Sequence, residues 1–151
     1  REHLLAVAAL PGVSASEAAE THELQARAAL IERDYDTARL EAARAEEADP
    51  DRPVRAFIEG RIALLQGRPA EAAVAFETAL AAAERGRRPP LGDLRVLAAE
   101  ALTRLDRTTE AEALLESELR VFPDSARARA GLQAIGRANG RSSRDPAVAH
   151  H

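Results

Sequence analysis

The chain has 151 residues, a formal net charge of −4 and no cysteine, and 46% of its residues are hydrophobic while only 3% are aromatic. The acidic balance argues against a general nucleic-acid binder, no apolar run approaches the roughly 18 residues of a membrane-spanning helix, and the lack of cysteine excludes disulfides and thiol chemistry. Alanine supplies much of the apolar content, so we expect one domain of closely packed helices, without membrane insertion and without a nucleic-acid partner.

The first segment, residues 1–12, is helical in composition and ends at Pro11-Gly12. Its apolar content predicts that it packs on the following helices as an N-terminal cap, or that it is the second half of a hairpin whose first half precedes Arg1. The chain starts at Arg1 and contains no methionine. We therefore expect it to be a piece of a longer protein.

Two helices are predicted next. Ser14 followed three residues later by Glu17 is a capping box, from which a helix runs to about Glu32. Asp34 can cap a second helix that runs to about Ala48, and Asp51 is expected to cap the helix after that.

The segment 53–85 predicts a helical hairpin. Its two amphipathic helices meet at residues 66–69, where Gly67 can adopt the left-handed conformation that ends a helix. Pro69 has its backbone dihedral pre-set for a first helical turn. In the second helix, Ala72, Phe76 and Ala79 form one apolar stripe.

The remaining chain predicts a basic, proline-containing linker and three more helices. These run from about residues 93 to 105, 109 to 121 and 124 to 138, the last capped by Asp124 or Ser125 and closed by Gly140. We expect residues 140–151 to be disordered, with His150-His151 as the remnant of a purification tag.

These helices recur with a period of 34 residues. Ala38 and Ala72 are 34 residues apart, and Ala72 and Ala111 are 39 apart, which is the same period with five inserted residues. Twelve residues before these three alanines stand the small residues Ala26, Gly60 and Ala99. Four residues after them stand Ala42, Phe76 and Leu115. A two-helix hairpin cannot bury its apolar face alone, so the repeats must stack.

The recurrence from Ala19 to Asp124 resembles the tetratricopeptide repeat. The resemblance implies an all-α fold, in which antiparallel helix hairpins stack as a right-handed α-solenoid with flanking N- and C-terminal helices. Three repeats (19–52, 53–86 and 92–123) would occupy residues 13–123, and residues 124–139 would form a C-terminal capping helix. The aromatic residue expected in the middle of each first helix is missing, and Ala29, Ala63 and Leu102 stand there instead.

The sequence offers no candidate catalytic, metal-binding or cofactor-binding residues. Its four histidines and its carboxylates show no spacing of a known ligand set. The acidic run 46–51 is interpreted as a helix end, a turn and a cap. Gly60-Arg61 and Gly67-Arg68 lack the further glycines and the preceding strand of a nucleotide-binding loop. We therefore predict a protein that is not an enzyme and needs no cofactor.

The resemblance also implies a binding surface, because the first helices of such repeats line a concave groove. The predicted partner-binding residues on this groove are Glu23, Arg27, Phe57, Ile58, Arg61, Val96, Leu97 and Glu100. An apolar centre flanked by Arg27 and Arg61 predicts an amphipathic helix or a mildly acidic, apolar segment as the partner.

Two functions remain open at this point. The first is an interaction scaffold that binds a protein or peptide segment, part of its own chain, or a second copy as a homodimer. The second is a regulatory appendage of a larger hydrolase, because residues 111–141 loosely resemble repeats at the C-termini of some sulfatase-like and phosphatase-like enzymes. The high arginine and alanine content favours a bacterial source, and we expect a cytoplasmic rather than a secreted location.

Overall fold

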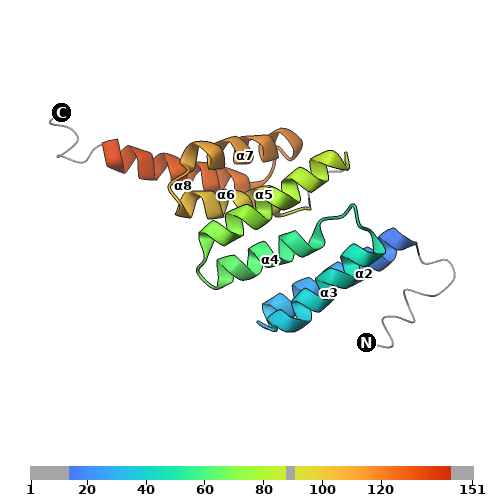
Figure 1. Ribbon diagram of the computed structural model, residues 1–151. Coiled ribbons are helices and arrows are strands. Elements are labelled where there is room, and N and C mark those ends of the chain that lie inside the picture. Colours follow the sequence, from blue (N-terminus) through green and yellow to red (C-terminus); the bar gives the residue numbers. More distant parts are fainter. Residues whose placement is uncertain (1–13, 88–90, 144–151) are drawn as a thin grey trace. The chain divides into compact units, whose positions relative to one another are not determined.

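The structure is a computed structural model that describes residues 14–87 and 91–143, with side chains as far as Gly140. These residues form seven α-helices and no strand (Figure 1): α2 (Ala15–Ile31), α3 (Tyr35–Ala48), α4 (Val54–Leu65), α5 (Pro69–Arg85), α6 (Leu94–Arg104), α7 (Thr108–Val121) and α8 (Ala126–Ser143). The all-α prediction is therefore confirmed for the described chain. The predicted cap at residues 1–12 and most of the predicted tail lie outside the described residues.

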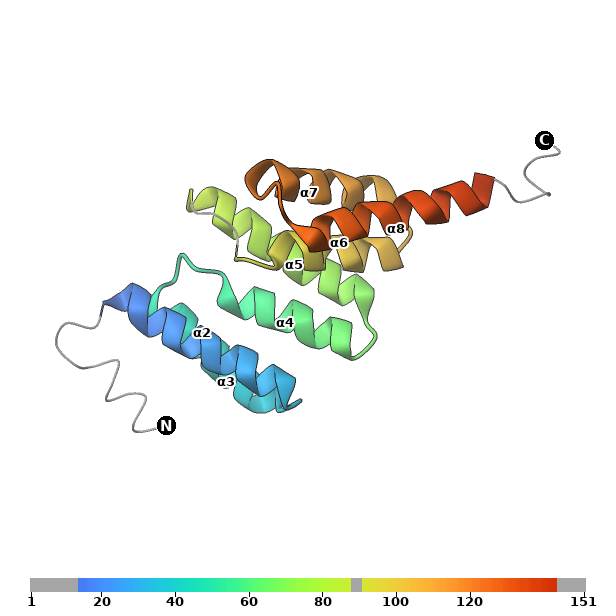
Figure 2. The same ribbon diagram turned by 180° about the vertical axis from the view of Figure 1, so that it is seen from behind.

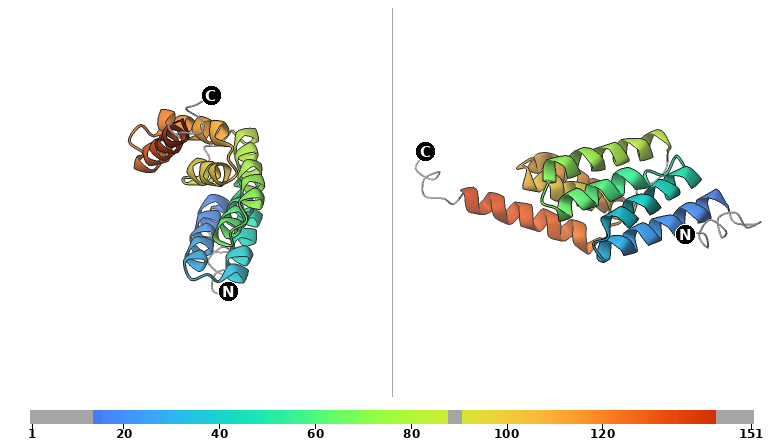
Figure 3. Two further views of the ribbon diagram at one scale, coloured as in Figure 1. Left: turned by 90° about the vertical axis from the view of Figure 1, so that its left-hand side faces the viewer. Right: turned by 60° about the horizontal axis from the view of Figure 1, so that its bottom comes forward.

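The chain divides into two compact units, residues 1–91 and 92–151. In the N-terminal unit, the hairpins α2/α3 and α4/α5 lie side by side, with α3 packed on α4 and α2 also touching α4 (Figure 3). In the C-terminal unit, α6 and α7 form a hairpin and α8 packs against both (Figure 2). Within each unit, helices that form antiparallel hairpins and pack in sequence order are thus confirmed, whereas the stacking of all three hairpins as one right-handed solenoid stays a prediction.

Local chemistry places most helix ends as predicted. The side chain of Ser14 accepts a hydrogen bond from the backbone N–H of Glu17 at 3.0 Å. Asp34 does the same for the N–H of Thr37 at 3.2 Å. Gly67 has a φ of 73°, the left-handed conformation that an L side chain resists, and α5 begins directly at Pro69.

Two predicted helix ends are wrong. Asp51 does not cap α4, because that helix starts at Val54 with Pro53 in the capping position and no side-chain cap bond. A capping side chain must stand directly before the first helical residue to reach the free N–H groups. Gly140 does not end α8, which continues to Ser143. A glycine inside a helix costs only about 0.5–1 kcal/mol relative to alanine, and Gly140 is not among the described residues with positive φ.

The repeat positions form the core of both units. The six small residues and three partners that recur with the 34-residue period are all buried: Ala26, Ala38, Ala42, Gly60, Ala72, Phe76, Ala99, Ala111 and Leu115. In the N-terminal unit, the rings of Phe57 and Phe76 lie 6.4 Å apart between centroids, tilted by 55°. Small residues at the helix crossings let the backbones approach, and the few large side chains fill the remaining space.

Candidate functional site

The predicted apolar centre of the binding groove lies in the protein core. Phe57 and Ile58 are both 0% exposed, because α4 packs against α3 on one side and α5 on the other. The expectation that they form an exposed surface is therefore wrong. A helix that is apolar on most of its circumference is covered from several sides, and the sequence pattern alone does not assign one face to a partner.

Arg27 and Arg61 lie over the ring of Phe57 rather than at a separate binding rim. Their guanidinium carbons are 4.6 Å and 5.9 Å from the ring centroid. Both side chains are half-buried. A guanidinium at this distance from an aromatic face is attracted by the ring electrons. The two arginines therefore stabilise the core at the position where α2 meets α4.

Glu23 serves an internal role as well. Its carboxylate is almost fully buried and accepts hydrogen bonds from Arg27 Nε at 3.1 Å and from Arg52 Nε at 2.7 Å. Arg52 lies in the connection between α3 and α4, so this ion pair ties that connection to α2. Burying an unpaired carboxylate lowers the stability of the folded protein. Glu23 avoids this loss because it is paired with two arginines of the same chain.

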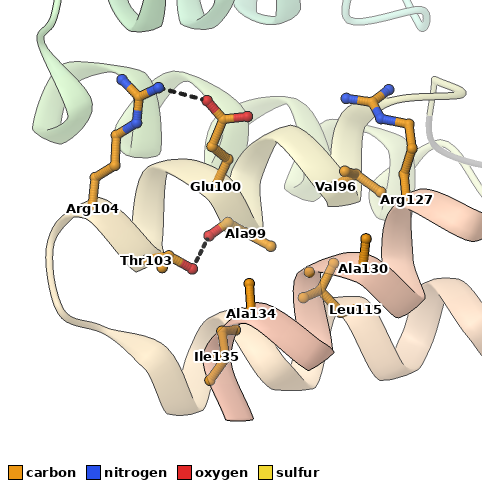
Figure 4. Close-up of a pocket in the computed structure, with 11 residues that line it drawn as sticks. Val96, Ala99, Glu100, Thr103, Arg104, Leu115, Arg127, Ala130, Ala134 and Ile135 are labelled. Atoms are coloured by element: carbon orange, nitrogen blue, oxygen red, sulfur yellow. Dashed lines mark hydrogen bonds and ion pairs between the residues drawn. The ribbon is translucent and has the colours of Figure 1, made fainter. Parts of the chain in front are cut away.

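The C-terminal unit carries an open groove between α6 and α8, of about 390 Å³ (Figure 4). Its floor consists of the buried side chains of Ala99, Leu115 and Ile135. Exposed alanines of α8, Ala130 and Ala134, form one wall. On α6, the opposite wall and its charged rim consist of Val96, Glu100, Thr103 and Arg104, and the remaining lining residues, Arg127 and Gly131, lie on α8.

Gly131 keeps the groove floor closed beneath α8. A Cβ atom at this position would lie 2.9 Å from a methyl group of Leu115, which is closer than carbon atoms tolerate. The glycine therefore lets α8 approach α7, and Leu115 remains at the base of the groove. The apolar floor therefore depends on the contact between α7 and α8, which do not form a hairpin of the 34-residue repeat.

The rim of the groove is charged and adaptable. Arg104 pairs with Glu100 at 2.9 Å, and Arg127 pairs with Asp93 at 3.1 Å. All four side chains are between 41% and 56% exposed. Ion pairs at such exposure contribute only about 0–1 kcal/mol. Both arginines can therefore exchange an internal carboxylate for one from a partner at little cost.

A second hollow of about 320 Å³ continues the groove past Val96 and Arg127, which line both. It is bordered by Phe122, whose side chain is 52% exposed although it is large and apolar. Exposed aromatic side chains in a hollow are frequent anchors of protein interfaces. Phe122 was not predicted as a binding residue, because it follows the last turn of α7 and belongs to no helical stripe.

The eight predicted partner-binding residues are thus divided between the two units. Five lie in the N-terminal unit, and Val96, Leu97 and Glu100 lie on α6. Val96 and Glu100 line the groove, whereas Leu97 is buried and does not. The residues of α8 were not predicted, because residues 124–139 were interpreted only as a cap.

The described residues contain no group of three or more His, Asp or Glu side chains that could hold a metal ion. The buried His22 instead pairs with Glu41 at 2.8 Å, and Glu41 in turn accepts a hydrogen bond from Arg44. This network joins α2 to α3. Within the described chain, no helix has the length and apolar character needed to cross a membrane.

Comparison with known proteins identifies a matching protein family. Residues 63–135, from the end of α4 into α8, match the family model described as tetratricopeptide repeat. Neither the curated proteins nor the solved structures contain a match to the chain.

Proposed function

The chain carries tetratricopeptide repeats, and from this premise we propose that its C-terminal unit binds a segment of another protein in the groove between α6 and α8. Tetratricopeptide repeats generally mediate protein–protein interaction, and the family is typically a non-enzymatic scaffold. The observation that carries the proposal is the groove itself, with an apolar floor at Leu115 and Ile135 and a charged rim.

The size and chemistry of the groove favour a peptide segment as the occupant. A volume of about 390 Å³ falls in the range of about 300–1,000 Å³ that is usual for pockets that hold small molecules, so the groove has room for a large side chain of a peptide. It can take up an aliphatic or aromatic side chain on the floor. An adjacent backbone would then lie between Ala130 and Ala134 on one side and Val96 on the other. Small alanine side chains allow such close approach.

A selection of random 12-residue peptides displayed on phage tests the proposal without knowledge of the natural partner. Peptides selected on the wild-type protein should carry at least one large apolar residue. The Ala130→Glu substitution places a carboxylate on the apolar wall and should weaken their binding at least about tenfold. Ala138→Glu is the matched control, since Ala138 is an exposed alanine of the same helix that does not line the groove.

Binding can be measured by fluorescence polarisation with labelled copies of the selected peptides. Selected peptides that bind the wild type and Ala130→Glu equally well would place the binding surface elsewhere, and failure to select any peptide would also contradict the proposal. Sedimentation of the wild-type protein alone tests a second copy as the occupant. The alternative predicted from the sequence, attachment to a hydrolase domain, stays a prediction.

A further inference from the structure

Helix α8 has an unusual charge for this chain. It contains four arginines and no aspartate or glutamate, although the whole chain has a net charge of −4. Because Arg127 borders the groove, this positive helix forms one side of the proposed binding site. The charge of α8 therefore bears directly on the chemistry of the partner.

Part of this charge forms a row along the outward face of α8. Arg129, Gln133 and Arg137 follow one another every four residues, on the side of the helix opposite the buried Ala128 and Ile135. Arg141 continues the same spacing along the helix backbone. Ala130 and Ala134 lie between this row and the groove floor. We call Arg129 and Arg137 the arginine row.

The arginine row is only partly neutralised by the chain itself. Arg129 has the exposed carboxylate of Asp124 at 3.7 Å. Arg137 has no ion pair with any other described residue and is exposed. On the opposite side of the groove, Glu100 and Arg104 neutralise each other. An approaching segment therefore meets a net positive wall at α8 and a neutral wall at α6.

The composition of this face discriminates between classes of anionic partner. A helix that lies in a membrane interface buries large apolar residues, but the exposed apolar side chains of α8 are all alanines. Single-stranded nucleic acid is held by aromatic side chains that stack on the bases, and α8 contains none. Carboxylates of a protein segment match arginine well, because the guanidinium can donate two hydrogen bonds to one carboxylate.

We propose, building on the proposed function, that the segment bound in the α6–α8 groove is acidic. Its apolar side chain occupies the floor above Leu115, and its aspartates or glutamates lie across α8 toward Arg137 and Arg129. Arg127 can add a contact by exchanging Asp93 for a partner carboxylate. The arginine row thereby selects acidic segments among the apolar peptides that the groove accommodates.

The test uses the peptides selected above, each synthesised with its acidic residues and again with every Glu replaced by Gln and every Asp by Asn. For the wild-type protein, the neutral version should bind about five- to tenfold more weakly. Arg137→Gln should weaken binding of the acidic version about threefold and leave the neutral version unchanged. Arg120→Gln, at an exposed arginine of α7 that does not line the groove, is the matched control.

The salt dependence provides a second measurement. Raising the salt concentration from 50 to 300 mM should weaken the acidic peptides several-fold in the wild type and less in Arg137→Gln, because salt screens exposed charges. Selected peptides that depend on Ala130 but show no preference for acidic residues would overturn this inference and leave the proposed function standing. Peptides that are insensitive to Ala130→Glu would instead contradict the proposed function, and the inference with it.

Discussion

Gly60 of α4 and Phe76 of α5 are in direct contact, and only glycine fits at the first position. A Cβ atom on Gly60 would lie 2.5 Å from Cε1 of the Phe76 ring. The equivalent pairs in the other two repeats are Ala26 with Ala42 and Ala99 with Leu115. Among the three pairs, the smallest residue, Gly60, stands opposite the largest partner, Phe76. This indicates that the side chains at the two positions fill the same space between the helices.

This relationship predicts an energetic coupling. Gly60→Ala should destabilise the protein by about 1–2 kcal/mol, because overpacking outweighs the better helix propensity of alanine. In combination with Phe76→Leu, which reproduces the Ala99–Leu115 pair, the same substitution should be nearly neutral. A double-mutant cycle of urea melts measures the coupling. Strictly additive effects of the two substitutions would contradict shared packing.

Phe76→Ala should destabilise the protein by about 3–5 kcal/mol, because it removes a fully buried ring and leaves a cavity between α4 and α5. Val74→Ala on the same helix is the control, because Val74 is 66% exposed and should change stability by no more than about 0.5 kcal/mol. Urea melts followed by circular dichroism at 222 nm measure the free energy of unfolding of both variants. Equal losses for the two variants would show that Phe76 has no special place in the core.

Phe57 and Phe122 should respond in opposite ways to a charge. Phe57→Glu removes a fully buried ring and buries a carboxylate in its place, and even with Arg27 and Arg61 nearby the lost packing and the buried charge should cost at least about 4 kcal/mol, which unfolds the N-terminal unit. Phe122→Glu alters a half-exposed residue and should leave the helical content unchanged while weakening peptides that extend into the second hollow. Circular dichroism and peptide binding separate the two. A folded Phe57→Glu protein would contradict the burial of Phe57.

Glu23→Gln tests whether the buried carboxylate is structural. The substitution removes the negative charge that Arg27 and Arg52 share and one of the two acceptor oxygens, and we expect a loss of about 1–3 kcal/mol, below the value for a fully buried pair because both arginines are partly exposed. The control is Glu59→Gln, which breaks the exposed pair with Arg39 and should cost less than about 0.5 kcal/mol. If Glu23→Gln were as harmless as the control in urea melts, the ion pair would be dispensable.

Glu110, near the start of α7, should titrate at unusually low pH. Two hydrogen bonds from Arg107 lower the pKa of this carboxyl group, desolvation opposes them, and the positive charge of Arg107 adds to the lowering. Because the folded pKa lies below the unfolded one, the stabilisation is complete above the unfolded pKa and is lost as the pH falls through the folded pKa. An NMR titration of Glu110 measures this, and Arg107→Gln should return the pKa toward its ordinary value. A Glu110 titration that does not change in Arg107→Gln would refute the assignment.

The amino-acid sequence by itself determined the repeat and most helix boundaries. Ser14, Asp34 and Gly67 act on backbone groups within a few residues of themselves, so their effect is readable without knowledge of the fold. The 34-residue period is also readable from the sequence alone, because small residues recur at the positions where the helices of each hairpin cross. Every one of these periodic positions is buried in the structure.

Only the tertiary structure decided which apolar and charged side chains remain available to a partner. Phe57 and Ile58 were predicted at a surface and lie in the core, since helical periodicity identifies the faces of a helix but not the number of neighbours that cover them. Glu23 is paired with Arg52, 29 residues away in sequence, and α8 becomes a wall of the groove only because it packs beside α6. Such contacts depend on how helices distant in sequence meet, and this information is not contained in any local pattern of residues.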